Sequence, residues 1–235
     1  MSKHDDDAPR VLLITGASSG IGAASARAAV QAGWSVVLAA RSADKLAVLV
    51  EEFGASRAHA LTVDVTDYAA QQAMVADALG WQGRLDAVFA NAGAGGQPGG
   101  FSGAPVESWQ RMVELNILGV AYTLRASLEA LKASRGHVVL TGSVAGRRTL
   151  AGSMYSATKW AVSAIGYGLR EELRGTGVRV TLIEPGMVDT PFFDDPKPDA
   201  LAPEDVARSV LYALLQPPSV DVHELMILPT PPVTD

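Results

Sequence analysis

The chain has no cysteine, which excludes disulfide bonds and metal sites built on thiolates. It has only four histidines, His4, His59, His137 and His223, and their scattered positions show no metal-ligand spacing, so we expect no metal site. Basic residues are in the minority, since 19 Lys and Arg stand against 25 Asp and Glu. Because binding to a phosphate backbone needs clustered basic residues, we expect no nucleic-acid partner.

Long apolar runs are missing as well. The apolar stretch 11–14 is too short for the core of a signal peptide, and no stretch has the length of a membrane span. These patterns predict a cytoplasmic protein with no membrane partner. We expect residues 1–9 to form a flexible leader and residues 229–235 a C-terminal tail.

Between these ends, residues 10–228 alternate between short β-rich runs and longer helical stretches, with no linker or internal repeat. Strands separated by helical crossovers indicate parallel pairing, with helices on both faces of one sheet. The pattern predicts a single α/β domain, a Rossmann-type doubly wound parallel sheet of about seven strands. The expected strands are 11–15, 35–40, 59–63, 85–90, 136–141, 178–183 and 224–228, and the expected helices are 21–32, 44–53, 68–79, 107–132, 153–174 and 203–215.

A glycine-rich turn, Thr-Gly-Ala-Ser-Ser-Gly-Ile-Gly, joins the first strand to the first helix. Gly16 permits a tight exit from the strand, Gly20 allows backbone to approach a pyrophosphate, and Gly22 lets the helix pack on the sheet. The helix N-terminus offers free N–H groups to phosphates, and Ser18 and Ser19 add hydroxyl donors. The turn alone leaves open a glycine-rich loop without a ligand.

The end of the second expected strand bears on the choice of cofactor. Sheets that bind NAD usually place an acidic residue there to accept hydrogen bonds from the adenosine ribose, but this chain has Ala40. Arg41 follows and is able to pair with the 2′-phosphate of NADP. The alternative is a solvated surface arginine. We favour NADP(H) and keep NAD(H) as possible.

Tyr155 and Lys159 are four residues apart in a helical stretch, so they share one face. A nearby ammonium lowers the pKa of a phenol, which suits general acid–base catalysis near neutral pH. A helix surface pair is the alternative for so common a pattern. Ser143 follows the fifth expected strand and 91–93 follow the fourth, so their side chains belong to the same sheet edge.

In the order and spacing of these segments, together with Asn116 and Pro185-Gly186, the chain closely resembles the classical short-chain dehydrogenases/reductases over residues 11–228. The resemblance implies that Tyr155 is the acid/base, that Ser143 orients the substrate oxygen, and that Lys159 holds the nicotinamide ribose and lowers the pKa of Tyr155. It implies that Asn116 holds a water that links Lys159 to solvent. Ala90 is a mild departure, since this position is often asparagine.

The resemblance also assigns contacts with the cofactor. They fall in the glycine turn, after four strands and on the catalytic helix. The expected cofactor-binding residues are Gly16, Ser18, Ser19, Gly20, Ile21, Arg41, Asp64, Val65, Asn91, Ala92, Gly93, Tyr155, Lys159, Pro185, Gly186, Val188 and Thr190.

The expected function is therefore an NADP(H)-dependent oxidoreductase that transfers a hydride between nicotinamide and a small carbonyl or alcohol. A catalytically silent NADP(H)-binding sensor or scaffold on the same fold is the alternative. The resemblance further implies a homodimer or homotetramer.

The sequence says less about the substrate. Met187, Phe192 and Phe193 suggest apolar contacts, although lid packing explains them equally well. Arg147 or Arg148 is a candidate anchor for a substrate carboxylate, with a solvated loop as the alternative. The ending 223–230 resembles a subgroup that oxidises serine-like and other small 3-hydroxy acids.

Overall fold

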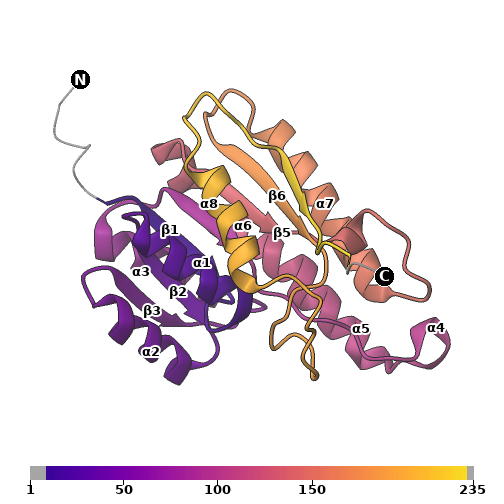
Figure 1. The fold of residues 1–235 in the computed structure, drawn as a ribbon. Helices are drawn as coiled ribbons and strands as arrows, with labels where there is room; N and C mark the ends of the chain where they lie inside the picture. Colours follow the sequence, from indigo (N-terminus) through magenta and orange to yellow (C-terminus); the bar gives the residue numbers. More distant parts are fainter. Residues whose placement is uncertain (1–8, 232–235) are drawn as a thin grey trace.

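The computed structural model of the protein, which describes residues 9–231, contains a seven-stranded parallel sheet in the order β3-β2-β1-β4-β5-β6-β7 (Figure 1). This arrangement confirms the predicted Rossmann-type doubly wound sheet. Strands β1 and β2 are buried along their whole length, which explains why their sequences are apolar without alternation. The strands are β1 (Val11–Thr15), β2 (Ser35–Ala40), β3 (Ala58–Thr62), β4 (Ala87–Ala90), β5 (His137–Thr141), β6 (Arg179–Pro185) and β7 (Glu224–Ile227).

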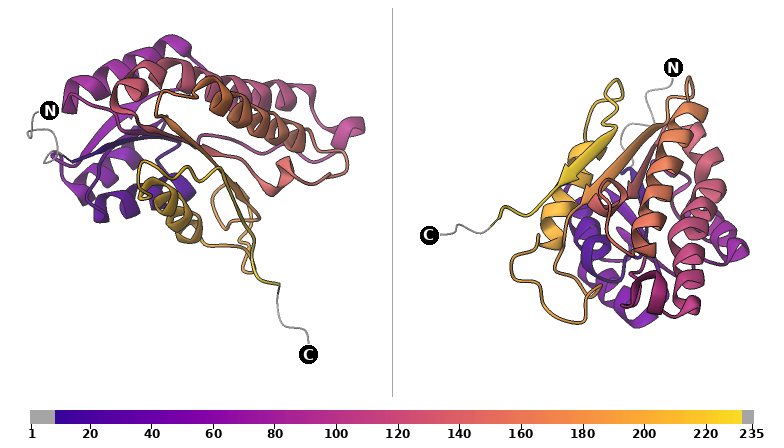
Figure 2. Two further views of the ribbon diagram at one scale, coloured as in Figure 1. Left: turned by 90° about the horizontal axis from the view of Figure 1, so that it is seen from above. Right: turned by 90° about the vertical axis from the view of Figure 1, so that its right-hand side faces the viewer.

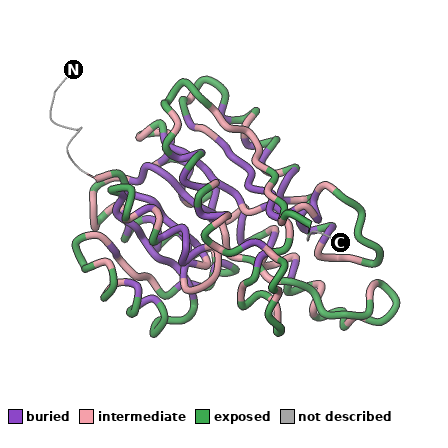
Figure 3. The backbone as a smooth tube through the Cα atoms, viewed as in Figure 1, coloured by how far each residue is buried: buried purple, intermediate pink, exposed green. Residues whose placement is uncertain are grey.

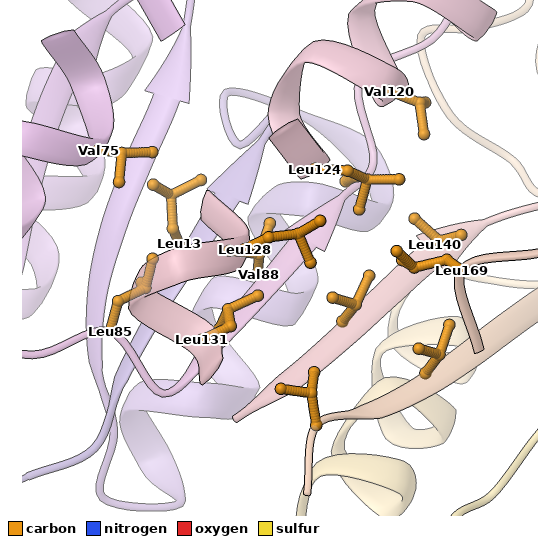
Figure 4. Packing of buried hydrophobic residues seen from close by; sticks show 14 of the residues in the cluster. Leu13, Val75, Leu85, Val88, Val120, Leu124, Leu128, Leu131, Leu140 and Leu169 are labelled. Atoms are coloured by element: carbon orange, nitrogen blue, oxygen red, sulfur yellow. The ribbon is translucent and has the colours of Figure 1, made fainter. Parts of the chain in front are cut away.

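Helices cover both faces of the sheet (Figure 2). One face is covered by α1 (Gly20–Gln31), α2 (Ala43–Phe53) and α8 (Pro203–Leu214), and the other by α3 (Tyr68–Gln82), α6 (Gly119–Ser134) and α7 (Met154–Glu172). Each face has its own apolar core, and the exposed backbone lies in the loops and on the outer helix surfaces (Figure 3). In the core beneath α6, Leu13 and Val88 of the sheet pack with Leu124, Leu128 and Leu131 of the helix (Figure 4).

The structure corrects the single helix predicted over residues 107–132. It has α5 (Val106–Val113), then the π-helical segment η1 (Glu114–Leu118), and then α6. A π-helical turn holds an extra residue, and hydrophobic periodicity does not reveal it. A short helix, α4 (Gly100–Gly103), also lies within the segment expected to be a loop. Asn116 falls inside η1, so this irregularity lies where a functional residue was predicted.

The predicted leader and tail lie mostly outside the described residues, in 1–8 and 232–235. Within residues 9–231, no helix is long and apolar enough to cross a membrane. The same part of the chain has no group of three or more His, Asp or Glu side chains arranged to hold a metal ion.

Candidate active site

A cavity of about 390 Å³ lies at the carboxyl edge of the sheet, where ligands bind in folds of this type. Every residue predicted to contact the cofactor lines it, and so does Ser143. Asn116 does not line it. Ala40, which the sequence singled out for its lack of an acidic group, also lines the cavity; the sequence did not single out Ser42, Val63, Leu115, Thr141, Gly142 and Pro191. Most of these are neighbours of predicted residues at the strand ends, which is the signal that would have found them.

The glycine turn forms one wall of this cavity. Gly16 has φ +66°, and a Cβ there would lie 2.9 Å from the Cα of Ala92, so the close approach of the two loops requires glycine. Ser19 is the N-cap of α1, yet its side chain caps no N–H group, and the first turn has no acidic side chain. The N-terminus of α1 therefore keeps its partial positive charge and its free N–H groups, which fit the pyrophosphate of a dinucleotide.

Asn91 is held by hydrogen bonds within the sheet edge. Its Nδ2 donates to the carbonyl of Thr15 at 3.1 Å, and its Oδ1 accepts from Thr141 Oγ1 at 3.1 Å. Thr15 Oγ1 in turn accepts from the backbone N–H groups of Asn91 and Ala92, each at 3.1 Å. Asn91 thus joins the ends of β1, β4 and β5, and it shapes the floor of the cavity through these strands.

At the other end of the cavity, Arg41 and Asp64 follow β2 and β3. Hydrogen bonds from the N–H and Oγ1 of Thr66, at 3.0 and 2.8 Å, lower the pKa of Asp64, and the nearby charge of Arg41 lowers it further. Arg41 is exposed at the rim, and Ala40 supplies no carboxylate. This end therefore offers one exposed guanidinium and one ionised carboxylate to a bound nucleotide.

Ser143, Tyr155 and Lys159 converge at the opposite end. The hydroxyl of Ser143 lies beside the phenol of Tyr155 in the cavity wall, donates to the carbonyl of Pro185 at 3.5 Å, and accepts from the N–H of Ala145 at 3.1 Å. The buried Lys159 donates from Nζ to the carbonyl of Thr141 at 2.8 Å. Its ammonium lies 5.7 Å from the centre of the Tyr155 ring. Strand β5 supplies the first of these residues through its following loop, and one face of α7 supplies the other two.

The pKa values of this group differ from the sequence prediction. Burial raises the pKa of Tyr155 to about 12, outweighing the hydrogen bond with Ser143 that lowers it. Burial lowers the pKa of Lys159 to about 8, and the charge of Glu184 partly opposes this. The prediction of a lowered phenol pKa is therefore wrong for this arrangement, because desolvation dominates. Tyr155 keeps its proton at neutral pH, which suits the donation of a proton to a carbonyl oxygen.

Asn116 braces the loop beside Lys159. Its Oδ1 accepts from the N–H of Ala94 and its Nδ2 donates to the carbonyl of Ala94, both at 2.9 Å. The same Nδ2 lies 3.1 Å from Thr158 Oγ1 on α7. A Cβ on Gly93 would lie 3.2 Å from Asn116 Oδ1. The structure thus gives Asn116 a bracing role, while its predicted hold on a water stays a prediction.

Arg147 is not available as an anchor for a substrate. Its guanidinium binds both oxygens of Glu224, at 2.9 and 3.0 Å, and lies 3.0 Å from Glu184 Oε1. Its NH2 group also donates to Tyr167 at 2.8 Å. The hypothesis of a carboxylate anchor is therefore wrong for Arg147. Arg148 is exposed and does not line the cavity, so its role stays a hypothesis.

Aromatic residues flank the reactive end. The ring of Phe192 packs edge-to-face on Tyr155, with centroids 5.6 Å apart, and on Phe193 at 5.1 Å. Gly95 makes room for it, since a Cβ there would lie 2.9 Å from Phe192 Cζ. Both phenylalanines line the cavity, and Met187 does not. The space next to Tyr155 is therefore apolar and aromatic.

Comparison with known proteins extends these observations. Residues 10–200 match the family model described as short chain dehydrogenase. An uncharacterized oxidoreductase of Staphylococcus haemolyticus is 42% identical over 225 residues, covering 94% of this chain and 97% of the relative. The structure of serine dehydrogenase from Escherichia coli matches with a TM-score of 0.85 and 34% identity, covering 93% of this chain and 97% of that chain. An alcohol dehydrogenase from the archaeon Thermococcus sibiricus, complexed with 5-hydroxy-NADP, matches with a TM-score of 0.87 and 34% identity, covering 96% and 99%.

Proposed function

Because the chain belongs to the short chain dehydrogenase family and is an oxidoreductase with a nucleotide-binding Rossmann fold, we propose that it uses NADP(H) to interconvert a small carbonyl compound and its alcohol. The observation that carries this proposal is the convergence of Ser143, Tyr155 and Lys159 on one cavity. NADP(H), when bound, supplies or accepts the hydride. The complex of the similar alcohol dehydrogenase with 5-hydroxy-NADP supports the same cofactor here.

The chain's own residues move and hold the proton. Tyr155 gives its phenolic proton to the substrate oxygen during reduction and takes it back during oxidation. The hydroxyl of Ser143, which lies beside that phenol, orients the substrate oxygen. Lys159 places a buried positive charge near the phenol, which stabilises the phenolate left after the proton has gone.

Arg41 and the glycine turn hold the two ends of the cofactor. The guanidinium of Arg41 pairs with the 2′-phosphate, and the N-terminus of α1 receives the pyrophosphate. The loop after β6, which includes Val188 and Thr190, covers the nicotinamide end of the site. NAD(H) fits the same cavity without the bond to Arg41, so its use is expected to be weaker.

The lining next to Tyr155 favours an uncharged substrate. Among the described residues that line the cavity, the cations are Arg41, at the far end, and Lys159, which donates to Thr141. The reactive end instead presents Leu115 and the rings of Phe192 and Phe193. A carboxylate placed there loses its hydration without gaining a free basic partner. A small aldehyde or ketone with an apolar flank fits better.

The experiment that tests this proposal compares substrates of matched shape. NADPH oxidation is followed with small aldehydes and ketones, and with acetoacetate against methyl acetoacetate, which share the 3-oxo acyl chain, while the methyl ester removes the negative charge. We expect turnover with the neutral compounds and a higher kcat/KM for the methyl ester. A preference for acetoacetate contradicts the neutral substrate. An absence of turnover with every carbonyl compound, despite tight NADPH binding, contradicts the enzyme and favours the sensor.

We also propose that the chain forms a homodimer or homotetramer. Exposed large apolar side chains support self-association, and some of them lie on the outer surfaces of two parts of the fold. On α7 and η1 they are Trp160 and Leu118, exposed by 49% and 39%, and near α8 and β7 they are Tyr212, Leu215 and Met226. Light scattering coupled to size-exclusion chromatography should give two or four chains per particle, and a monomer would contradict the proposal.

A further inference from the structure

A fully buried carboxylate lies directly behind the reactive end of the cavity, and the proposed mechanism does not use it. This is Glu184 of β6, which has no exposed surface. Its Oε2 accepts the backbone N–H of Ser143 at 2.6 Å. Its Oε1 lies 3.0 Å from Ser163 Oγ and 3.0 Å from the guanidinium of Arg147. Burying a carboxylate is costly in free energy unless it is paired and hydrogen-bonded. Glu184 has such partners, and a residue kept at this cost is a candidate for a functional role.

The neighbouring residue is shaped to admit the carboxylate. A Cβ on Gly142 would lie 2.5 Å from Glu184 Oε2 and 2.6 Å from its Cδ, so any larger residue here would push the carboxylate from its place. Gly142 also ends its strand by donating its N–H to the carbonyl of Ile183 at 2.8 Å. Two successive N–H groups, those of Gly142 and Ser143, therefore bind this segment to β6, and the second of them donates to the carboxylate of Glu184.

The hydrogen bond between Ser143 and Glu184 affects catalysis because the backbone and the side chain of Ser143 have different partners. Its backbone N–H is bound to Glu184, while its hydroxyl lies beside the phenol of Tyr155 in the wall of the cavity. A hydrogen bond to a charged acceptor is shorter and stronger than one between neutral groups. A change at the buried carboxylate therefore moves the hydroxyl that orients the substrate oxygen.

We propose that Glu184 is a positioning residue for the reaction: its carboxylate anchors the backbone of Ser143 and so fixes the Ser143 hydroxyl against Tyr155, with Arg147 as the counter-ion. The inference rests on the proposed function, because it gives Glu184 a part in the same reaction. It also explains why Arg147, a predicted anchor for a substrate carboxylate, instead pairs with a carboxylate of the protein. The guanidinium neutralises the buried charge at Oε1, while Ser143 binds Oε2.

The substitution Glu184→Gln separates positioning from folding. Glutamine has nearly the same shape, and its amide oxygen still accepts one hydrogen bond, but without a charge. Arg147 keeps both of its bonds to Glu224, so the variant leaves no unpaired guanidinium. The control Ser163→Ala removes another partner of the carboxylate and leaves the bond to Ser143 in place.

The test is a double-mutant cycle of E184Q and S143A, with kcat and KM measured for NADPH and a neutral ketone. We expect E184Q to lower kcat about tenfold with the KM for NADPH changed less than about twofold, and to cost less than about twofold in the S143A background. Ser163→Ala should keep nearly full kcat. If E184Q does not fold, Gly142→Ala, which displaces the carboxylate, should give the same loss of kcat.

The inference would be overturned if E184Q lowered kcat by the same factor in the wild-type and S143A backgrounds. It would also be overturned if E184Q changed only the KM for NADPH. In either case the wild-type chain still turns over, so the proposed function stands. A wild-type chain that reduces no carbonyl compound overturns the proposed function, and this inference with it.

Discussion

Replacing Arg41 should weaken the binding of NADP(H) and leave the binding of NAD(H) nearly unchanged. Arg41 lies at the exposed rim of the cavity directly after β2, and Ala40 supplies no acid there to bind a ribose 2′-hydroxyl. A hydrogen bond between charged groups contributes about 1.5 to 3 kcal/mol, which corresponds to a roughly 10- to 150-fold change in affinity. Arg41→Ala should therefore raise the KM for NADPH by that factor and leave the KM for NADH nearly unchanged.

The assay measures KM for both cofactors with one neutral ketone. The control is Arg174→Ala, because the Arg174 side chain is 77% exposed and pairs with Glu171 outside the cavity. Adding salt should weaken NADPH binding to the wild type more than to the variant, since salt screens exposed charges. An equal rise in both KM values would refute the reasoning, because Arg41 would then support the fold of the site and not the 2′-phosphate.

Three further outcomes follow from the buried polar groups. The kcat/KM for reduction should stay level from neutral pH and then fall near pH 8, where Lys159 loses its proton. Burial lowers the pKa of Lys159 to about 8, and it raises the pKa of Tyr155 to about 12. A kcat/KM that stays level until Tyr155 itself loses its proton contradicts this prediction. Burial lowers the pKa of His137 from 6.5 to about 3. Between pH 6.5 and about pH 3, the folded protein therefore binds fewer protons than the unfolded chain. The free energy of unfolding falls as the pH falls through this range. Urea unfolding should show a loss of about 2 kcal/mol at pH 5 relative to neutral pH, and His137→Gln should remove that slope. Asn116→Leu removes both hydrogen bonds to the partly buried backbone of Ala94, which should cost about 1 to 3 kcal/mol and lower Tm by roughly 2 to 12 °C. An unchanged Tm contradicts the bracing role.

The sheet was predictable because its strands are short, apolar and separated by helices. Strand β1, Val-Leu-Leu-Ile-Thr, is buried on both faces, and such a strand has no alternation to confuse its assignment. The site was predictable for a related reason. The carboxyl ends of parallel strands meet at one edge, so residues such as Asp64, Asn91 and Ser143 come together although the chain separates them widely.

The remaining features depend on contacts that no local pattern encodes. Arg147 meets Glu224, 77 residues away, and Glu184 meets Ser143, 41 residues away. An arginine in a loop looks the same in the sequence whether it faces a substrate or a buried carboxylate. The pKa of Tyr155 was misjudged for the same reason, because the pairing with Lys159 is visible in the spacing and the desolvation is not.

The central claim is that Tyr155 exchanges a proton with a substrate oxygen. The most direct test compares Tyr155→Phe with the wild type in NADPH oxidation with a neutral ketone, alongside the Kd for NADPH. General acid–base catalysis contributes a factor of about 10² to 10⁴, so the variant should lose turnover by that factor while its Kd stays within about threefold. A variant that binds NADPH and retains near wild-type turnover would contradict the role assigned to Tyr155.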